Sequence, residues 1–160
     1  MDDLSLLKNV GPISALKLND LGIYNYLDLL FYLPFRYLDF SKTLNISDYI
    51  FNEPATYSGI VISFNNIFTR SHKNIQRATI KDSTGTLNLI WFNQPYLSKN
   101  IIIGQNLNVA GSVTFFQNKI TIVAPLIGNK TGRIIPLYHQ SATLNSAWIE
   151  KTIKLNLEFL

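Results

Sequence analysis

An aromatic segment, WFNQPYL at residues 91–97, carries the side chains best suited to binding chemistry. Phe92 and Tyr96 are four residues apart, and Lys99 follows three residues after Tyr96. Flat rings can stack on unpaired nucleic-acid bases, each contributing about 1–3 kcal/mol, and a neighbouring lysine can contact phosphate. These residues are therefore candidates for a nucleic-acid stacking site. The alternative is that Phe92 and Tyr96 only cover the end of a hydrophobic core.

Basic side chains concentrate in the same part of the chain. Residues 55–127 contain six basic side chains and one acidic side chain, whereas residues 1–54 have four basic and seven acidic ones. A localised positive charge attracts polyanions such as nucleic acids, although it can also serve solubility. Phosphate contacts would give an affinity that depends on salt and not on base sequence. The candidate phosphate-binding residues are Arg70, Lys73, Arg77, Lys81, Lys99 and Lys119.

Motifs for catalysis, metal binding or nucleotide binding are not found in the sequence. The segment at 128–132 has two glycines but lacks the spacing and terminal lysine of a phosphate-binding loop. His72 and His139 are far apart in sequence and occur in no metal-binding pattern. Asp82 is the single carboxylate of the basic region, so no acid–base pair is visible there. We expect a binding module with no catalytic residues, no metal site and no cofactor of its own.

Composition places the chain among globular proteins. Of its 160 residues, 47% are hydrophobic and 15% are charged, which is too apolar for a disordered chain. There is no cysteine, no signal peptide and no apolar run near the roughly 18 residues of a membrane span. These features predict a soluble cytoplasmic protein without a membrane partner.

Residues 55–127 have the hydrophobic pattern of β-strands. The pattern predicts strands at 55–64, 76–81, 86–92, 107–115 and 120–123, with turns at 82–85 and 117–118. A break at 93–103 predicts a short helix. Three strands, a helix and two strands is the order of an OB-fold, a five-stranded barrel that often binds oligonucleotides. In this arrangement Trp91 faces the core, and Phe92 faces the opposite side.

Helical patterns flank the strands on both sides. One helix is expected to end near Gly22, and a second one to begin at the cap residue Asn25 and to run through Leu33. The turn at 10–12 is similar to that of a helix-hairpin-helix motif, but the local charge is negative and a plain helical hairpin is favoured. The predicted fold is mainly β with flanking helices, comprising an N-terminal helical hairpin at 1–54, an OB-fold barrel at 55–127 and a connector with a short helical segment at 128–160.

Four segments in matching order resemble the N-terminal part of the bacterial RecG branched-DNA helicases. They are VGPISALKLNDLGI, DLLFYLPFRYLDFS, IKDSTGTLNLIWFNQPYL and GRIIPLY. The resemblance implies a wedge domain that binds replication forks and Holliday junctions and splits their arms while a motor pulls the duplex. It also implies that Phe92 caps the leading-strand arm and that Tyr96 caps the lagging-strand arm.

The sequence departs from that family in two respects. Asn9 stands where a helix-hairpin-helix often has glycine, and the RecA-like motor lobes, which would bind ATP and magnesium, are absent. The resemblance therefore implies a monomeric, truncated part of a helicase of recombination and repair. Its expected partners are branched DNA, with single-stranded and duplex arms, and the motor domains of the parent helicase. Two alternatives stay open, a generic single-strand-binding OB module and a protein-interaction module that docks on a helicase.

Overall fold

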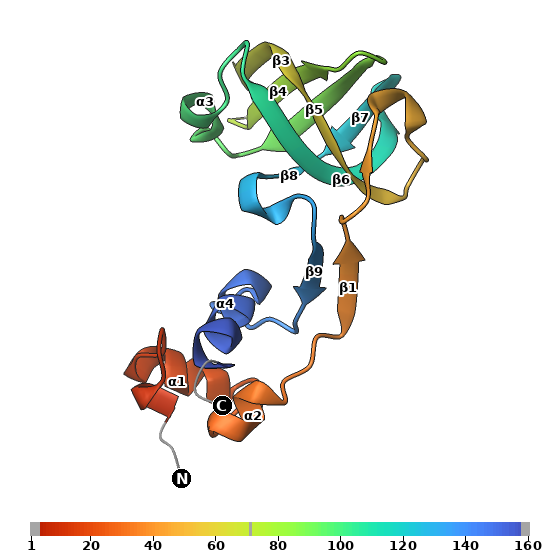
Figure 1. Ribbon diagram of the computed structural model, residues 1–160. Helices are drawn as coiled ribbons and strands as arrows, with labels where there is room; N and C mark the ends of the chain where they lie inside the picture. Colours follow the sequence, from red (N-terminus) through yellow and green to blue (C-terminus); the bar gives the residue numbers. More distant parts are fainter. Residues whose placement is uncertain (1–3, 71, 158–160) are drawn as a thin grey trace. The chain divides into compact units, whose positions relative to one another are not determined.

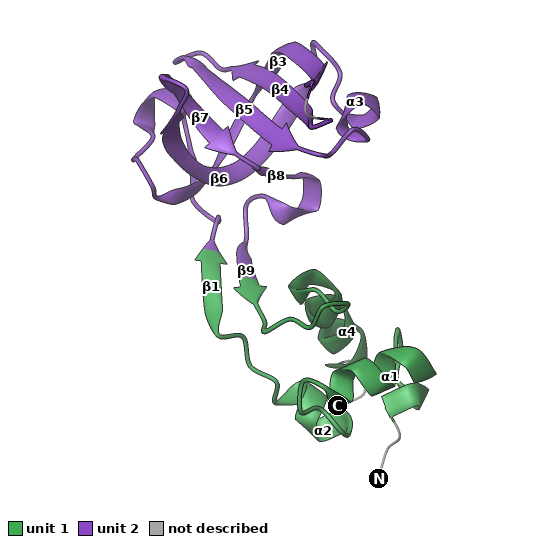
Figure 2. Ribbon diagram, turned by 180° about the vertical axis from the view of Figure 1, so that it is seen from behind, with its two compact units in different colours: residues 1–38, 136–160 green, residues 39–135 purple. Residues whose placement is uncertain are grey.

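The computed structural model describes residues 4–70 and 72–157, and the chain divides into two compact units. Residues 1–38 and 136–160 form the helical unit, and residues 39–135 form the barrel unit (Figure 2). The chain passes between the units along strands β1 (Arg36–Asp39) and β9 (Ile134–Leu137), which pair in a two-stranded sheet.

The barrel unit contains a seven-stranded sheet with the order β2-β3-β4-β5-β7-β6-β8, and β3 also pairs with β6 (Figure 1). Its strands are β2 (Thr43–Leu44), β3 (Pro54–Phe68), β4 (Asn74–Lys81), β5 (Thr86–Phe92), β6 (Asn106–Phe116), β7 (Lys119–Val123) and β8 (Leu126–Ile127). Helix α3 (Leu97–Asn100) lies between β5 and β6 in sequence. The five longer strands, β3 to β7, form the predicted OB-fold barrel, so the expected fold class is confirmed.

Close packing between strands explains two glycines of the barrel. Strand β3 pairs with β6 along its first half and with β4 along its second half, with an irregularity after Val61 that lets it bend. A Cβ on Gly111 would collide with the side chain of Ile122, and one on Gly59 would lie 2.9 Å from the carbonyl oxygen of Lys81. Both positions therefore exclude a larger side chain.

An apolar core fills the barrel. Its fully buried members include Tyr57, Val61, Ile80, Leu87, Val109, Val113 and Ile122. Trp91 faces this core as predicted, with 1% of its surface exposed. Its indole Nε1–H donates a hydrogen bond to the carbonyl oxygen of Pro125 at 2.9 Å, which satisfies the buried polar atom.

The turn between β4 and β5 is organised by the carboxylate of Asp82. This group accepts hydrogen bonds from the backbone N–H groups of Ile46, Thr84 and Gly85 and from the Thr84 hydroxyl. Desolvation raises the pKa of Asp82, but the hydrogen bonds outweigh it and lower the pKa to about 2.

We expect Asp82→Ala to lower the free energy of unfolding by about 1–2 kcal/mol at neutral pH, because several donors lose a charged partner in a partly solvated turn. A carboxylate whose pKa is lowered by folding stabilises the fold fully at pH values above 3.8, which is its pKa in the unfolded chain. This contribution is lost as the pH falls through the folded-state pKa of about 2. Urea unfolding should therefore show the stability difference narrowing below about pH 4. A difference that stays constant over this range would contradict the assigned role.

The helical unit contains η1 (Leu4–Leu6), α1 (Pro12–Asn19), α2 (Tyr26–Leu30) and α4 (Ser146–Leu157), whereas η2 (Ile46–Asp48) and η3 (Gly128–Lys130) belong to the barrel unit. After α1, Gly22 has a φ of 80° and the N–H of Ile23 bonds the carbonyl of Leu18, which gives the expected glycine-dependent end. Asn25 caps α2 by accepting a hydrogen bond from the backbone N–H of Asp28 at 3.0 Å. The predicted helix is too long, however, because α2 ends at Leu30 and not at Leu33.

Asn9 adopts the left-handed backbone conformation, with a φ of 67°. Asparagine enters this region more readily than most residues, which explains how it replaces the glycine that is usual in a helix-hairpin-helix. Its Nδ2 donates to Thr152 Oγ1 at 2.7 Å, and the buried Asn156 side chain pairs with both the N–H and the carbonyl of Lys8. These contacts pack the turn before α1 against α4.

Candidate nucleic-acid interface

Two exposed rings flank the point where β5 ends. Phe92 is the last residue of β5 and is 39% exposed, and Tyr96 is 56% exposed. The ring of Phe92 makes an edge-to-face contact with Phe116, with centroids 6.3 Å apart. The hydroxyl of Tyr96 donates to Gln94 Oε1 at 2.8 Å. Both rings thus present surface to solvent, which the stacking hypothesis requires, while their part in binding stays a prediction.

A polar network fixes the backbone between the two rings. Asn93 has a φ of 56°, which ends β5, and its N–H donates to the carbonyl of Asn74 at 2.7 Å. Gln76 is fully buried, and its Oε1 accepts the N–H of Gln94 at 3.0 Å. Its Nε2 donates to side-chain oxygens of Asn66 and Asn74. A buried amide with its partners satisfied rigidifies the segment around it.

Helix α3 begins one residue after Tyr96, so the predicted helix at 93–103 has the right place but is shorter than expected. Leu97 and Ile101 anchor it in the barrel core. Lys99 is exposed on α3, and its N–H bonds the carbonyl of Tyr96 at 3.1 Å. Lys99 therefore lies one helical turn after Tyr96.

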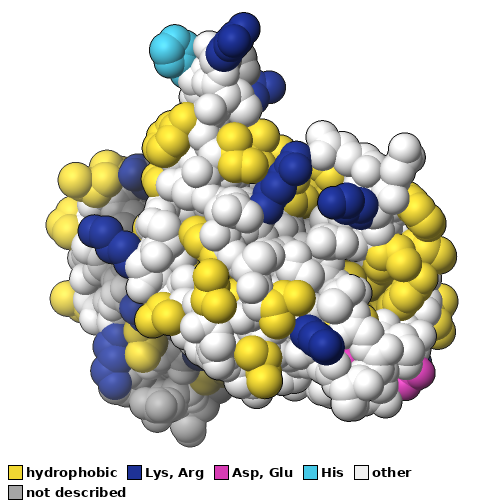
Figure 3. All heavy atoms as spheres, turned by 90° about the horizontal axis from the view of Figure 1, so that it is seen from above, with side chains coloured by type: hydrophobic (Ala, Val, Ile, Leu, Met, Phe, Trp, Pro, Cys, Tyr) yellow, Lys and Arg dark blue, Asp and Glu magenta, His cyan; other side chains and the backbone are white. Residues whose placement is uncertain are grey.

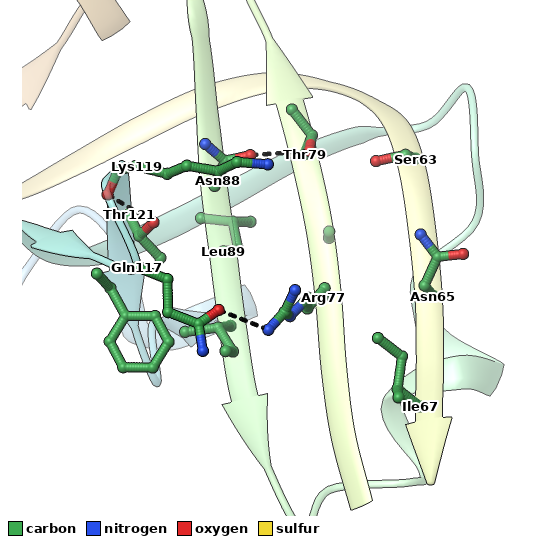
Figure 4. Close-up of a pocket in the computed structure, with 13 residues that line it drawn as sticks. Ser63, Asn65, Ile67, Arg77, Thr79, Asn88, Leu89, Gln117, Lys119 and Thr121 are labelled. Atoms are coloured by element: carbon green, nitrogen blue, oxygen red, sulfur yellow. Dashed lines mark hydrogen bonds between the residues drawn. The ribbon is translucent and has the colours of Figure 1, made fainter. Parts of the chain in front are cut away.

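A groove of about 460 Å³ crosses β3, β4, β5 and β7 (Figure 4). Phe116 lines this groove and contacts the ring of Phe92. Arg77 and Lys119 also line the groove, and the Arg77 guanidinium donates to Gln117 Oε1 at 2.8 Å. Polar side chains form much of the remaining wall, namely Ser63, Asn65, Thr79, Asn88 and Thr121. None of the described lining residues is acidic, so the groove suits an anionic chain.

The other predicted phosphate-binding residues are spread around the barrel. Arg70 and Lys73 are exposed between β3 and β4. Lys81 lies at the far end of β4, where it lines a different pocket, so the structure does not bring it into the groove with Arg77 and Lys119. In Figure 3, Lys and Arg side chains are spread over the visible face and over a narrow projection, and acidic side chains are sparse there.

A separate pocket of about 250 Å³ lies beside Tyr96 and adds a lysine that the sequence analysis missed. Gln94, Pro125 and Ile127 are among its lining residues, and so is Lys130 of η3. Lys130, Phe116 and Gln76 all belong to the surroundings of the two rings, yet no local motif singles them out. Only the folded barrel brings them to this place.

The rest of the described structure offers little for metal or membrane chemistry. Within residues 4–70 and 72–157, no three His, Cys, Asp or Glu side chains come together as a metal site. In the same ranges, no helix has the length and apolar character that crossing a bilayer requires. His72 and His139 are both exposed.

Comparison with known proteins identifies the family. A family model described as the RecG wedge domain matches residues 3–160. The chain belongs to the RecG wedge domain family. The resemblance expected from the four sequence segments is thus confirmed.

RecG relatives match most of this chain and a small part of their own length. The ATP-dependent DNA helicase RecG of Streptococcus pneumoniae is 33% identical over 152 residues, covering 94% of this chain and 22% of the helicase. RecG of Bacillus subtilis is 34% identical over 118 residues, covering 72% of this chain and 17% of that helicase. A structure of RecG bound to a three-way DNA junction matches with a TM-score of 0.86 and 28% identity, over 99% of this chain and 23% of that chain. The chain spans about a fifth of the length of these RecG proteins.

Proposed function

We propose that this chain binds branched DNA where the arms of a junction separate, as the wedge of a RecG-type helicase. The observation that carries the proposal is the pair of exposed rings, Phe92 and Tyr96, held by a rigid turn at the rim of an OB-fold barrel. Its membership of the RecG wedge family and its similarity to a junction-bound RecG support this reading.

Each ring lies near its own cavity, which suggests separate paths for two strands. Phe92 reaches the groove of Arg77 and Lys119 through Phe116, whereas Tyr96 shares a pocket with Lys130. Unstacking a base step costs a few kcal/mol. Stacking on each ring returns about 1–3 kcal/mol, which offsets that cost. The wedge thereby stabilises separated arms without catalysing a reaction.

Strand separation over many base pairs requires work that this chain does not supply. We place that work in the motor domains of a parent helicase, which would bind ATP and magnesium and pull the duplex against the wedge. The chain would then act as a monomer, in the cytoplasm, during recombination and repair. Its direct partners would be single-stranded and duplex arms of replication forks or Holliday junctions.

The preference for branched DNA can be measured by fluorescence anisotropy. A three-way junction should bind at least about tenfold more tightly than a single strand or a duplex of equal length, because only the junction engages both rings. Equal affinity for the junction and the single strand would favour a generic single-strand-binding module. Negligible DNA binding at low salt would instead favour a protein-interaction module.

The groove should contribute a salt-dependent part of the affinity. Phosphate contacts release counterions, so each lost contact lowers the slope of log affinity against log salt by about 0.7–0.9. We expect Arg77→Ala combined with Lys119→Ala to lower the slope by about 1.5 and to weaken binding to all DNA sequences equally. Lys151→Ala, on the exposed face of α4, is the matched control and should leave the slope unchanged. An unchanged slope in the double variant would show that DNA phosphates do not contact Arg77 and Lys119 in the groove.

A further inference from the structure

A third exposed ring, Phe68, has no role in the fold or in the site described above. Its side chain is 74% exposed, the highest value for a large hydrophobic residue in the described part of the barrel unit. Pairing and hydrogen bonds of the flanking residues hold it in this position. Phe68 pairs in register with Asn74, the N–H of Thr69 donates to the carbonyl of Lys73 at 2.9 Å, and the N–H of Lys73 donates to Thr69 Oγ1 at 3.0 Å.

Strand alternation places Phe68 on the opposite side of the sheet from the groove. The residues of β3 that line the groove are Ser63, Asn65 and Ile67. Residues in between point to the other side, where Phe64 packs against the core and Asn66 bonds the buried Gln76. Phe68 continues this second row past the end of the core.

The second row leads toward Tyr96. Asn66 bonds Gln76, Gln76 accepts the N–H of Gln94, and Gln94 in turn accepts the hydroxyl of Tyr96. The end of the β3–β4 hairpin also lies beside the end of β5, because Phe68 pairs with Asn74 and the N–H of Asn93 donates to the carbonyl of Asn74. Phe68 and Tyr96 therefore border the same end of the barrel.

We propose that Phe68 stacks on an unpaired base of the strand that passes Tyr96. This inference rests on the proposed function and adds a third stacking position on one side of the wedge. Two strand spacings, about 10 Å, separate the backbone at Phe68 from that at Asn93. This is roughly three times the 3.4 Å rise between stacked bases, so a base on Phe68 is not the direct neighbour of a base stacked at the end of β5.

The charges of the hairpin match a nucleic-acid strand. Residues 64–81 contain four basic side chains and no acidic one. Arg70 and Lys73 are exposed in the loop that follows Phe68, so both cations can contact phosphates next to the stacked base. Proteins that bind single-stranded nucleic acid combine exposed rings with nearby cations in this way. A contact with another protein would not require the positive charge of Arg70 and Lys73.

Binding to forks with one single-stranded arm at a time tests the inference. We expect Phe68→Ala to weaken binding about tenfold on the fork whose lagging-strand arm is single-stranded, which is the arm expected at Tyr96. The loss should be less than about twofold on the fork with a single-stranded leading-strand arm and on an all-duplex junction. Phe68→Tyr keeps a ring and should bind like the unchanged protein. Phe68→Leu keeps apolar volume without a ring and should lose nearly as much as alanine. Thermal melting verifies that each variant is folded.

Phe31→Ala is the matched control, because Phe31 is 75% exposed but belongs to the helical unit. It should bind all forks normally. The inference would be overturned if Phe68→Ala lost as much affinity for the all-duplex junction as for the fork. It would also be overturned if Phe68→Leu bound with full affinity, or if Phe68→Ala lost no affinity for any fork. If alanine at Phe92 and Tyr96 abolishes junction preference while Phe68→Ala has no effect, the proposed function stands and this inference fails. If the Phe92 and Tyr96 variant binds normally, the proposed function itself fails.

Discussion

Replacing Phe92 and Tyr96 together with alanine is expected to weaken binding to a three-way junction by about 100-fold. Each stacked base is worth about 1–3 kcal/mol, and two losses of ~1.4 kcal/mol multiply to this factor. The rings are 39% and 56% exposed, so their removal should change the free energy of unfolding by less than about 1 kcal/mol. Anisotropy titrations and thermal melts of the same preparations measure the two effects separately.

Phe115→Ala provides a control for the loss of an exposed ring. Phe115 lies on the barrel, is 64% exposed and stacks on Phe51 with centroids 5.4 Å apart, outside the groove and the Tyr96 pocket. Its removal should leave junction binding within about twofold. If the double variant instead melts much earlier than the unchanged protein, Phe92 and Tyr96 belong to the core and the stacking role is wrong.

Trp91→Ala should have the largest effect on stability, although Trp91 is the neighbour of Phe92 in sequence. Its side chain is 1% exposed and fills the barrel core. Removing a buried aromatic ring costs about 3–5 kcal/mol, and the carbonyl of Pro125 also loses the indole donor. Since domains have about 5–15 kcal/mol of stability in total, much of the margin would be lost.

Urea unfolding of Trp91→Ala and of Phe92→Ala gives the comparison. The two adjacent residues should differ by at least about 2 kcal/mol, because strand alternation points one ring inward and the other outward. At low temperature, the folded fraction of Trp91→Ala should keep its preference for junctions. A loss below about 1 kcal/mol for Trp91→Ala would contradict its place in the core.

The barrel could be predicted because its signals are local. Alternation from Thr86 to Phe92 gave the bounds of β5 and the opposite directions of Trp91 and Phe92, both of which the structure confirms. Gln117 and Asn118 both have positive φ, as a tight hairpin turn requires. Each of these features depends on a few neighbouring residues.

Other features depend on contacts between distant segments and left no local pattern. Strands β1, β2, β8 and β9 have two to four residues each and exist through their pairing partners. The break at 93–103 predicts a helix longer than α3, because local sequence does not show that Asn93 ends β5 with a positive φ or that Ile101 is already extended and packs in the core.

The same reason limits how much of the candidate site the sequence could predict. The exposed pair of rings follows from alternation and from the break after β5. The buried Gln76 and the pocket lysine Lys130 lie in other segments, and they reach the rings only in the folded barrel. Charge alone groups Lys81 with Arg77, whereas the structure separates them along β4.

Ultraviolet cross-linking tests most directly whether Phe92 and Tyr96 meet the bases at a branch point. A 5-iodouracil placed at the branch of a three-way junction reacts with an aromatic ring stacked on it, and cleavage after Lys81 and Lys99 releases one peptide that contains both rings. Stacking at the branch predicts cross-links to Phe92 or Tyr96 that disappear when the probe is moved into the middle of a duplex arm. Cross-links that avoid this peptide, or that do not depend on the position of the probe, would contradict it.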